Sequence, residues 1–264
     1  MNLKKCISII VLIVIFLCKQ GGCKDIVIGT LLPKQKRFEF IIKGIKTHLS
    51  EIKIVNLLES KKVKPNLIIA YEKFLHQAIK FQKPTLVLAD NEHIVDIYKK
   101  YPTVKTAILL SAPLEKCMTL LKKKFKNIKT FSVVVGDKLE YNYLKVKHIK
   151  GLKIFFAKNM GDVPYKIDKA LKAADALIAV PSPVVFNYFS TQFILKKAIL
   201  EGKPVIGFSE DMLNLGAYAV VITDYFSEGC RVCSYIKKIL EHKKLAFRIL
   251  KAQNIKVITN HNLH

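Results

Sequence analysis

Apolar runs of four to eight residues alternate with amphipathic stretches along most of this chain. The first run, residues 25–32, ends at Pro33 and is followed by Phe38, Ile41, Ile45 and Leu49 at helical spacing. The same reading predicts further strands at 52–58, 66–70, 85–89, 106–111, 130–135, 152–157, 176–180, 204–208, 218–222 and 255–258. It predicts further helices at 72–81, 114–125, 139–148, 164–173, 184–200, 211–215 and 226–242.

Repeated strand–helix units favour right-handed crossovers and parallel sheets. The number of predicted strands exceeds what one open sheet usually holds. We therefore predict an α/β fold with two Rossmann-like lobes, residues 23–127 and 128–264, each built on a parallel sheet. The C-terminal tail after the last long helix is free to return to the first lobe.

The N-terminus has the pattern of a secretory signal over residues 1–22. Lys4 and Lys5 precede an apolar run from Ile9 to Cys18, and small residues follow it. The run is short for a membrane span, although an uncleaved anchor remains an alternative. Gly22-Cys23 is similar to the end of a lipoprotein cleavage box, so lipidation of Cys23 competes with ordinary cleavage nearby.

Charge and cysteine content exclude some classes of protein. The 264 residues carry a formal net charge of +25, but the lysines are spread along the chain and form no nucleic-acid module. We interpret them as a solvated basic surface. Cys230 and Cys233 form a lone CxxC pair, which favours a structural role, either as small packed residues or as a disulfide, over redox chemistry. The histidines lack metal-ligand spacing.

Small polar residues follow several predicted strands, where parallel sheets bind ligands. Ser182 and Ser209 are candidates to hold a ligand carboxylate, with helix capping as the alternative for both. Asp137 and Asp224 are candidates to bind an amine, or are ordinary helix caps. The candidate ligand-binding set is completed by Thr30, Tyr71, Ser111 and Phe208, with Tyr71 suited to stacking on a ring.

One stretch carries a family resemblance. It consists of short segments at successive predicted strands and strand ends in the second half of the chain. These are Asp175-Ala176-Leu177, Val180-Pro181, Lys203-Pro204-Val205-Ile206-Gly207-Phe208-Ser209-Glu210, Gly216-Ala217, Asp224 and Gly229. In these residues the chain resembles ABC transporter substrate-binding proteins of the type I periplasmic-binding fold, in their uncharacterised or aromatic-amino-acid-linked group. Asn66 to Ala70 and Pro113-Leu114-Glu115 extend the likeness into the first lobe.

The resemblance implies a periplasmic or otherwise extracytoplasmic solute-binding protein. It would capture a small molecule between its lobes for an ABC-type permease, without enzymatic activity, cofactor, metal or nucleic acid. No GxGxxG, P-loop or GxSxG motif argues for catalysis. The alternative is a sensory or scaffolding relative that has lost transport, because residues 58–65 are compressed and Tyr71-Glu72 departs from the family pattern.

Overall fold

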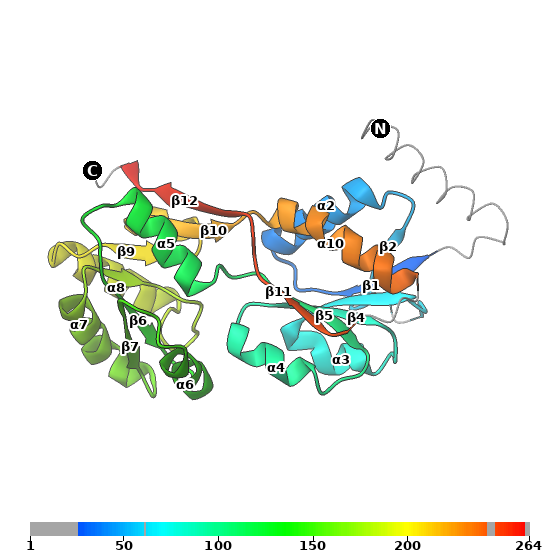
Figure 1. The fold of residues 1–264 in the computed structure, drawn as a ribbon, viewed down its shortest axis with the longest axis horizontal. Coiled ribbons are helices and arrows are strands. Elements are labelled where there is room, and N and C mark those ends of the chain that lie inside the picture. Colours follow the sequence, from blue (N-terminus) through cyan, green and yellow to red (C-terminus); the bar gives the residue numbers. More distant parts are fainter. Residues whose placement is uncertain (1–25, 61, 242–245, 262–264) are drawn as a thin grey trace.

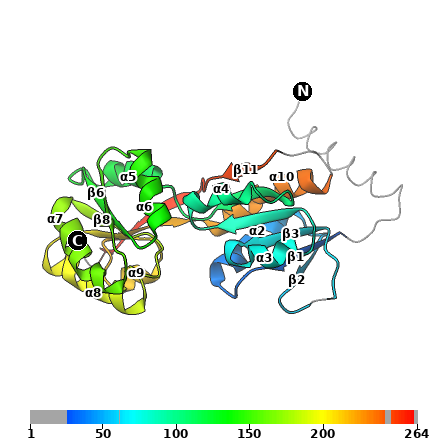
Figure 2. The ribbon, with the colours of Figure 1, turned by 90° about the horizontal axis from the view of Figure 1, so that it is seen from below.

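The computed structural model describes residues 26–60, 62–241 and 246–261. The predicted signal and Cys23 therefore lie outside the described residues. Two α/β lobes stand side by side, and each has a six-stranded sheet with helices on both faces (Figures 1 and 2). This arrangement confirms the predicted fold class of two lobes with largely parallel sheets.

The first sheet has the strand order β11-β5-β4-β3-β1-β2, and every pairing in it is parallel. Its central strands are buried on both faces, as near-continuous apolar runs such as Leu67-Ile68-Ile69-Ala70 require. The strands are β1 (Val27–Leu31), β2 (Lys53–Asn56), β3 (Leu67–Tyr71), β4 (Thr85–Ala89), β5 (Val104–Leu109) and β11 (Arg248–Leu250).

The second sheet has the order β12-β10-β9-β8-β6-β7. Its pairings are parallel except that β12 runs antiparallel to β10. The strands are β6 (Phe131–Val135), β7 (Leu152–Phe156), β8 (Ala176–Ile178), β9 (Val205–Gly207), β10 (Ala219–Thr223) and β12 (Ile255–Thr259).

Helices cover each sheet through amphipathic stripes. In the first lobe, one face is covered by α2 (Lys36–His48) and α10 (Tyr225–Leu240), and the other by α3 (Leu75–Ile79) and α4 (Val95–Tyr98). In the second lobe, the helices are α5 (Leu114–Lys124), α6 (Lys138–Lys147), α7 (Val163–Ala173), α8 (Tyr188–Leu200) and α9 (Asp211–Asn214). Short 3-10 turns η1 (Glu72–Phe74), η2 (Glu92–Ile94) and η3 (Met160–Asp162) complete the elements.

Helices α2 and α10 approach each other very closely because a glycine lies on each. A Cβ added at Gly44 would lie 2.2 Å from the carbonyl oxygen of Phe226, and one added at Gly229 would lie 2.2 Å from that of Ile41. Neither position therefore accepts a larger residue without separating the helices. The contact fixes the start of α10, which adjoins the passage between the lobes.

The CxxC cysteines belong to this same helix pair. Cys230 and Cys233 lie inside α10, and their thiols face the backbone of α2 near Gly44 and Ile45. Both are free thiols, and burial raises the pKa of Cys233 to about 11. A protonated, buried thiol supports the structural interpretation of the pair.

The chain passes between the lobes three times, between β5 and α5, between β10 and α10, and between β11 and β12. Helix α5, which the sequence division at 127 placed in the first lobe, packs with Cys117, Met118 and Leu121 against the second sheet. Helix α10 and strand β11 return to the first lobe instead. The return of β11 agrees with the freedom left to the C-terminal tail. The sequence pattern did not reveal the places of α5 and α10, because these depend on packing between distant segments.

Hydrogen bonds join the three crossing segments to one another. Thr223 Oγ1 donates to the Leu110 carbonyl at 2.7 Å, and the Asp224 amide donates to the Asn254 carbonyl at 2.8 Å. Glu228 of α10 is buried and forms an ion pair with Arg231. Its carboxylate also accepts hydrogen bonds from the backbone amides of Gln253 and Asn254. The three crossing segments are therefore held together by hydrogen bonds as one band between the lobes.

Two predicted helices differ in extent. The helix expected at 72–81 is the turn η1 followed by the short α3, and the helix expected from residue 184 begins at Tyr188. Asn187 is the N-cap of α8 and forms a capping box with Ser190, which fixes where the helix begins. The described residues between β2 and β3 form no helix, which agrees with the short connection that the sequence indicates at 58–65. In the described part of the chain, no helix is both long and apolar enough to span a membrane.

Candidate ligand-binding cleft

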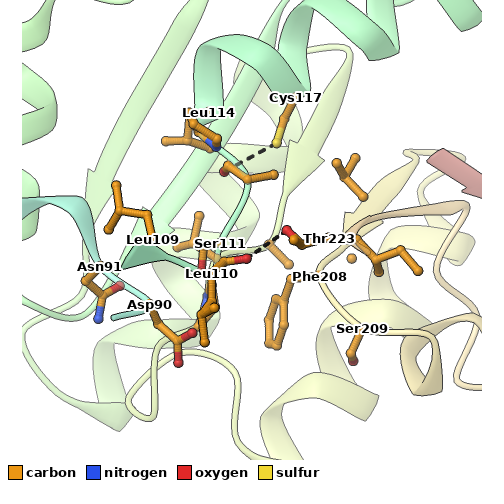
Figure 3. A pocket seen from close by; sticks show the side chains of 18 of the residues that line it. Asp90, Asn91, Leu109, Leu110, Ser111, Leu114, Cys117, Phe208, Ser209 and Thr223 are labelled. Atoms are coloured by element: carbon orange, nitrogen blue, oxygen red, sulfur yellow. Dashed lines mark hydrogen bonds between the residues drawn. The ribbon is translucent and has the colours of Figure 1, made fainter. Parts of the chain in front are cut away.

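A cleft of about 850 Å³ lies between the lobes, within the range of small-molecule sites. Its walls are the segments that follow the carboxyl ends of β4 and β5 in one lobe and of β8, β9 and β10 in the other. The start of α2 and one side of α6, from Glu140 to Lys147, complete them. In the close view, Asp90 and Asn91 lie on one side and Phe208 and Ser209 on the other (Figure 3).

The first-lobe wall is organised by an ion pair. Arg37, in the first turn of α2, holds Asp90 after β4 through two hydrogen bonds of 2.8 and 3.1 Å. The Tyr71 hydroxyl donates to the same carboxylate at 2.7 Å. The guanidinium group also lies over the rings of Phe38 and Tyr71. This bidentate pair presents a nearly neutral unit to the cleft, because each charge is already matched.

A second carboxyl group lies behind this pair. Glu72 Oε2 accepts the Asp90 amide at 3.3 Å and the Tyr98 hydroxyl at 3.4 Å. Burial and then the charge of Asp90 raise the pKa of Glu72 to about 7. Glu72 is therefore partly protonated near neutral pH, although it does not line the cleft.

The second-lobe wall is apolar with hydroxyl and carboxyl groups at its edge. Phe208 follows β9 and packs edge-on against Phe186, with ring centroids 6.2 Å apart. Ser209, Glu210 and Asp211 come next and line the cleft. The Ser209 hydroxyl has no hydrogen-bond partner among the residues that the structure describes, so it is available to a ligand.

An ionic network joins the lobes along one side of the cleft. The carboxylate of Glu92, in the first lobe, forms ion pairs with two lysines. Its oxygens lie 2.9 Å from Nζ of Lys147 in α6 and 2.5 Å from Nζ of Lys251 in the third crossing segment. Lys147 also pairs with Glu115 at the start of α5, at 2.8 Å. Burial alone would lower the pKa of Lys147, but Glu115 and Glu92 together outweigh it and raise that pKa, so the side chain stays charged. Beside this network, His93 Nε2 lies 3.7 Å from Asp137 Oδ1 of the second lobe.

Four residues of the candidate set line the cleft. They are Ser111 after β5, Phe208 and Ser209 after β9, and Asp224 after β10. Asp224 is also the N-cap of α10, because it accepts the Ser227 amide, and it pairs with Lys256 at 3.0 Å. These bonds lower the pKa of Asp224, so it is ionised. Ligand contact for all four stays a prediction.

The other four lie outside the cleft lining. Thr30 is buried, donates to the Val55 carbonyl and borders a second, shallower hollow beside α2. Tyr71 reaches the cleft only through Asp90. Ser182 is buried in a turn where its Oγ accepts the Val185 amide at 3.4 Å, and Asp137 caps α6 at the rim. Asp137 has the observed bond of a helix cap, whereas Ser182 closes a turn that ends before α8, whose N-cap is Asn187.

Sequence reasoning missed several charged residues that the cleft uses. Asp90 follows the predicted strand 85–89, so the strand-end rule could have found it. Arg37 is one of only three arginines among 45 basic residues, and that rarity was a usable signal. Glu92 and Lys147 have no comparable signal, because their pairing depends on contact between the lobes. Glu140 lies inside a predicted helix and not at a strand end, so the strand-end rule passes over it. Among the described residues, no group of three or more His, Cys, Asp or Glu is arranged to hold a metal ion.

The class defined by this geometry is a two-lobed binding protein with its site between the lobes. A family model described as ABC transporter substrate binding protein matches residues 73–263. The match covers well over half of the chain, and the chain belongs to this family. Comparison with the curated proteins gave no match.

Solved structures agree with the fold. The ligand-free, open structure of a substrate binding protein with adhesive properties from Clostridium difficile is 17% identical, with a TM-score of 0.65, and the match covers 90% of this chain and 92% of that one. An ABC domain in complex with L-Trp from Streptococcus pneumonia is 16% identical, with a TM-score of 0.60 and coverage of 91% and 93%. A solute binding protein from Burkholderia graminis in complex with D-arabinose is 12% identical, with a TM-score of 0.54 and coverage of 92% and 98%. At such identities the likeness concerns the fold, which is the type I periplasmic-binding fold.

Proposed function

We propose that this protein captures a small molecule in the interlobe cleft outside the cytoplasm and delivers it to an ABC-type permease. The observation that carries the proposal is the cleft itself, which the carboxyl ends of both sheets line in a chain of the substrate-binding family. No covalent step is needed for this role. Binding alone favours the closed arrangement when the ligand contacts both walls.

The membrane side of the proposal rests on the N-terminal sequence. Residues 1–22 would direct export, and Cys23 would carry a lipid if the box at Gly22-Cys23 is used. Fractionation of cells expressing the full chain tests both points. We expect the mature protein in the extracytoplasmic fraction, and Cys23→Ala should release it from the membrane if the lipid is present. Full-length protein in the cytoplasm contradicts export.

Ligand capture is tested by a thermal-shift screen of the purified mature protein. Amino acids, amines, small carboxylates, sugars and nucleosides form the library, because a ligand that binds only the folded state raises the apparent melting temperature. A hit should also compact the protein in small-angle X-ray scattering, as closure of the lobes requires. Absence of any hit across the library counts against solute binding and favours the scaffolding alternative.

A further inference from the structure

The charge of the cleft is opposite to that of the whole protein. The chain has 45 basic and 20 acidic residues, yet seven acidic and only four basic residues line the cleft. More than a third of all carboxylates thus gather around one cavity. The cleft and the family establish the site, and these carboxylates set the sign of its charge.

Three of the four basic side chains at the cleft are already neutralised. Arg37 is held by Asp90, Lys147 by Glu92 and Glu115, and Lys256 by Asp224. Lys36, the fourth, is exposed and extends toward the ring of Phe40. Little free positive charge therefore remains for an anionic ligand.

Three carboxyl groups of the lining have no ion-pair partner among the residues that the structure describes. Glu210 and Asp211 follow β9 next to Ser209, and Glu140 lines the same cleft from the first turn of α6. Glu140 is the most enclosed of the three. Burial, and then the charge of Asp137, raise its pKa to about 7, which is the behaviour of a carboxyl group short of a cation.

Resting on the proposed function, we infer that the ligand is a cationic small molecule, an organic amine whose apolar body packs on Phe208. The ammonium group would pair with the unpartnered carboxylates, Glu140 first, and its body would displace water from the apolar walls. An anion would leave these carboxylates unmatched, and a zwitterion would bring a carboxylate for which little free positive charge remains. A simple metal ion would leave the apolar lining unused. Focusing of the negative field in a low-dielectric cleft would concentrate such a cation there.

The positive charge of the whole protein makes this inference sharply testable. The full chain has a net charge of +25, and the mature protein keeps a large positive charge after loss of Lys4, Lys5 and Lys19, so non-specific attraction favours anions. A preference for cations must therefore come from the cleft. Measurements at 0.15 M salt are suited to the question, because distant charges are screened beyond about 8 Å and contact pairs are not.

The experiment compares three probes with one shared body, phenethylamine, 3-phenylpropionate and 2-phenylethanol, with a second series built on tryptamine. Binding to the mature protein is measured by thermal shift and calorimetry. We expect the amines to bind more tightly than the carboxylates and alcohols of the same body. Glu140→Gln, which keeps the shape and removes the charge, should weaken amine binding about threefold or more.

Glu51→Gln is the matched control, because Glu51 is exposed in the loop before β2 and away from the cleft lining. It should leave amine binding unchanged. The inference is overturned if carboxylates bind as tightly as the amines, if neither amine binds, or if Glu140→Gln has no effect. Binding of a carboxylate or a sugar in the general screen would overturn the cationic ligand and keep solute capture, so the two failures are distinguishable.

Discussion

At the scale of single residues, the two candidate serines have different surroundings. Ser182 is buried and accepts the Val185 amide, whereas Ser209 is half-buried, lines the cleft and has a free hydroxyl among the described residues. Ser182→Ala should therefore lower the free energy of unfolding by about 1 kcal/mol, the usual value of one hydrogen bond, without changing affinity. Urea denaturation and calorimetry of the mutant with any screened ligand measure the two quantities.

Ser209→Ala is the complementary change. It should leave the free energy of unfolding nearly unchanged and weaken binding of a screened ligand by about 1 kcal/mol, because a neutral hydrogen bond is lost. If Ser209→Ala destabilises the protein as much as Ser182→Ala does, the hydroxyl is a cap and not a ligand contact.

Glu72 gives a prediction about pH. Its folded-state pKa is raised to about 7 from an ordinary value of 4.5, so the ionised form is disfavoured in the folded protein. Ionisation of Glu72 therefore lowers the free energy of unfolding more and more as the pH rises from about 4.5 to 7. Above pH 7 the whole of this loss of stability is present. Glu72→Gln keeps an acceptor for the Asp90 amide and removes the charge.

We therefore expect Glu72→Gln to raise the melting temperature at pH 8 and to stabilise the protein by about 1 kcal/mol, reduced for the partial exposure of the group. The gain should shrink as pH falls and vanish near pH 4. Differential scanning calorimetry across this range measures it. A mutant that is less stable than the parent at pH 8 contradicts the raised pKa.

At the scale of elements, the helix pair α2–α10 is the most restrictive contact. Gly229→Ala would place a Cβ 2.2 Å from the Ile41 carbonyl oxygen, which forces the helices apart. Overpacking of this kind costs about 1–3 kcal/mol, and backbone on both sides leaves little room to relax. Urea denaturation should show a loss of at least this size. Gly161→Ala is the control and should change stability much less, because its added Cβ would approach only one side-chain atom, Asn159 Oδ1, at 3.1 Å and no backbone.

The elements themselves were predictable from the sequence, whereas their assignment to lobes was only partly so. Buried strands such as β3 and β4 are short apolar runs bounded by polar residues, and periodicity finds them. Helix α5 has an equally clear stripe, but the stripe does not say which sheet it covers. The strand-end rule located Ser111, Phe208, Ser209 and Asp224 at the cleft. It also selected Thr30 and Ser182, whose side chains turn into the protein and bond backbone atoms.

At the scale of the whole molecule, the ionic network around Lys147 connects the lobes on one side of the cleft. The side chains of Lys147 and Glu92 are 24% and 21% exposed, so solvent screens this pair less than an ordinary surface pair. If the lobes move about the band of crossing segments, this contact must break when the cleft opens. The partners are 55 residues apart and on different lobes, which is why sequence patterns do not reveal them.

Lys147→Met should therefore shift the free protein toward a more open arrangement. It leaves Glu115 without this partner, while Glu92 keeps Lys251, so the network is weakened and not abolished. We expect a loss of about 1 kcal/mol of interlobe contact energy, the scale of a partly buried pair. Small-angle X-ray scattering of the ligand-free protein should show a larger radius of gyration.

The matched control is Lys172→Met, which removes an ion pair of similar length, 3.0 Å to Asp168, that lies entirely within the second lobe. Its scattering curve should match that of the parent protein, because no contact between lobes is lost. High salt should also enlarge the parent and leave Lys147→Met less affected, since screening acts on the same interaction. An unchanged radius of gyration for Lys147→Met would show that the band of crossing segments alone sets the distance between the lobes.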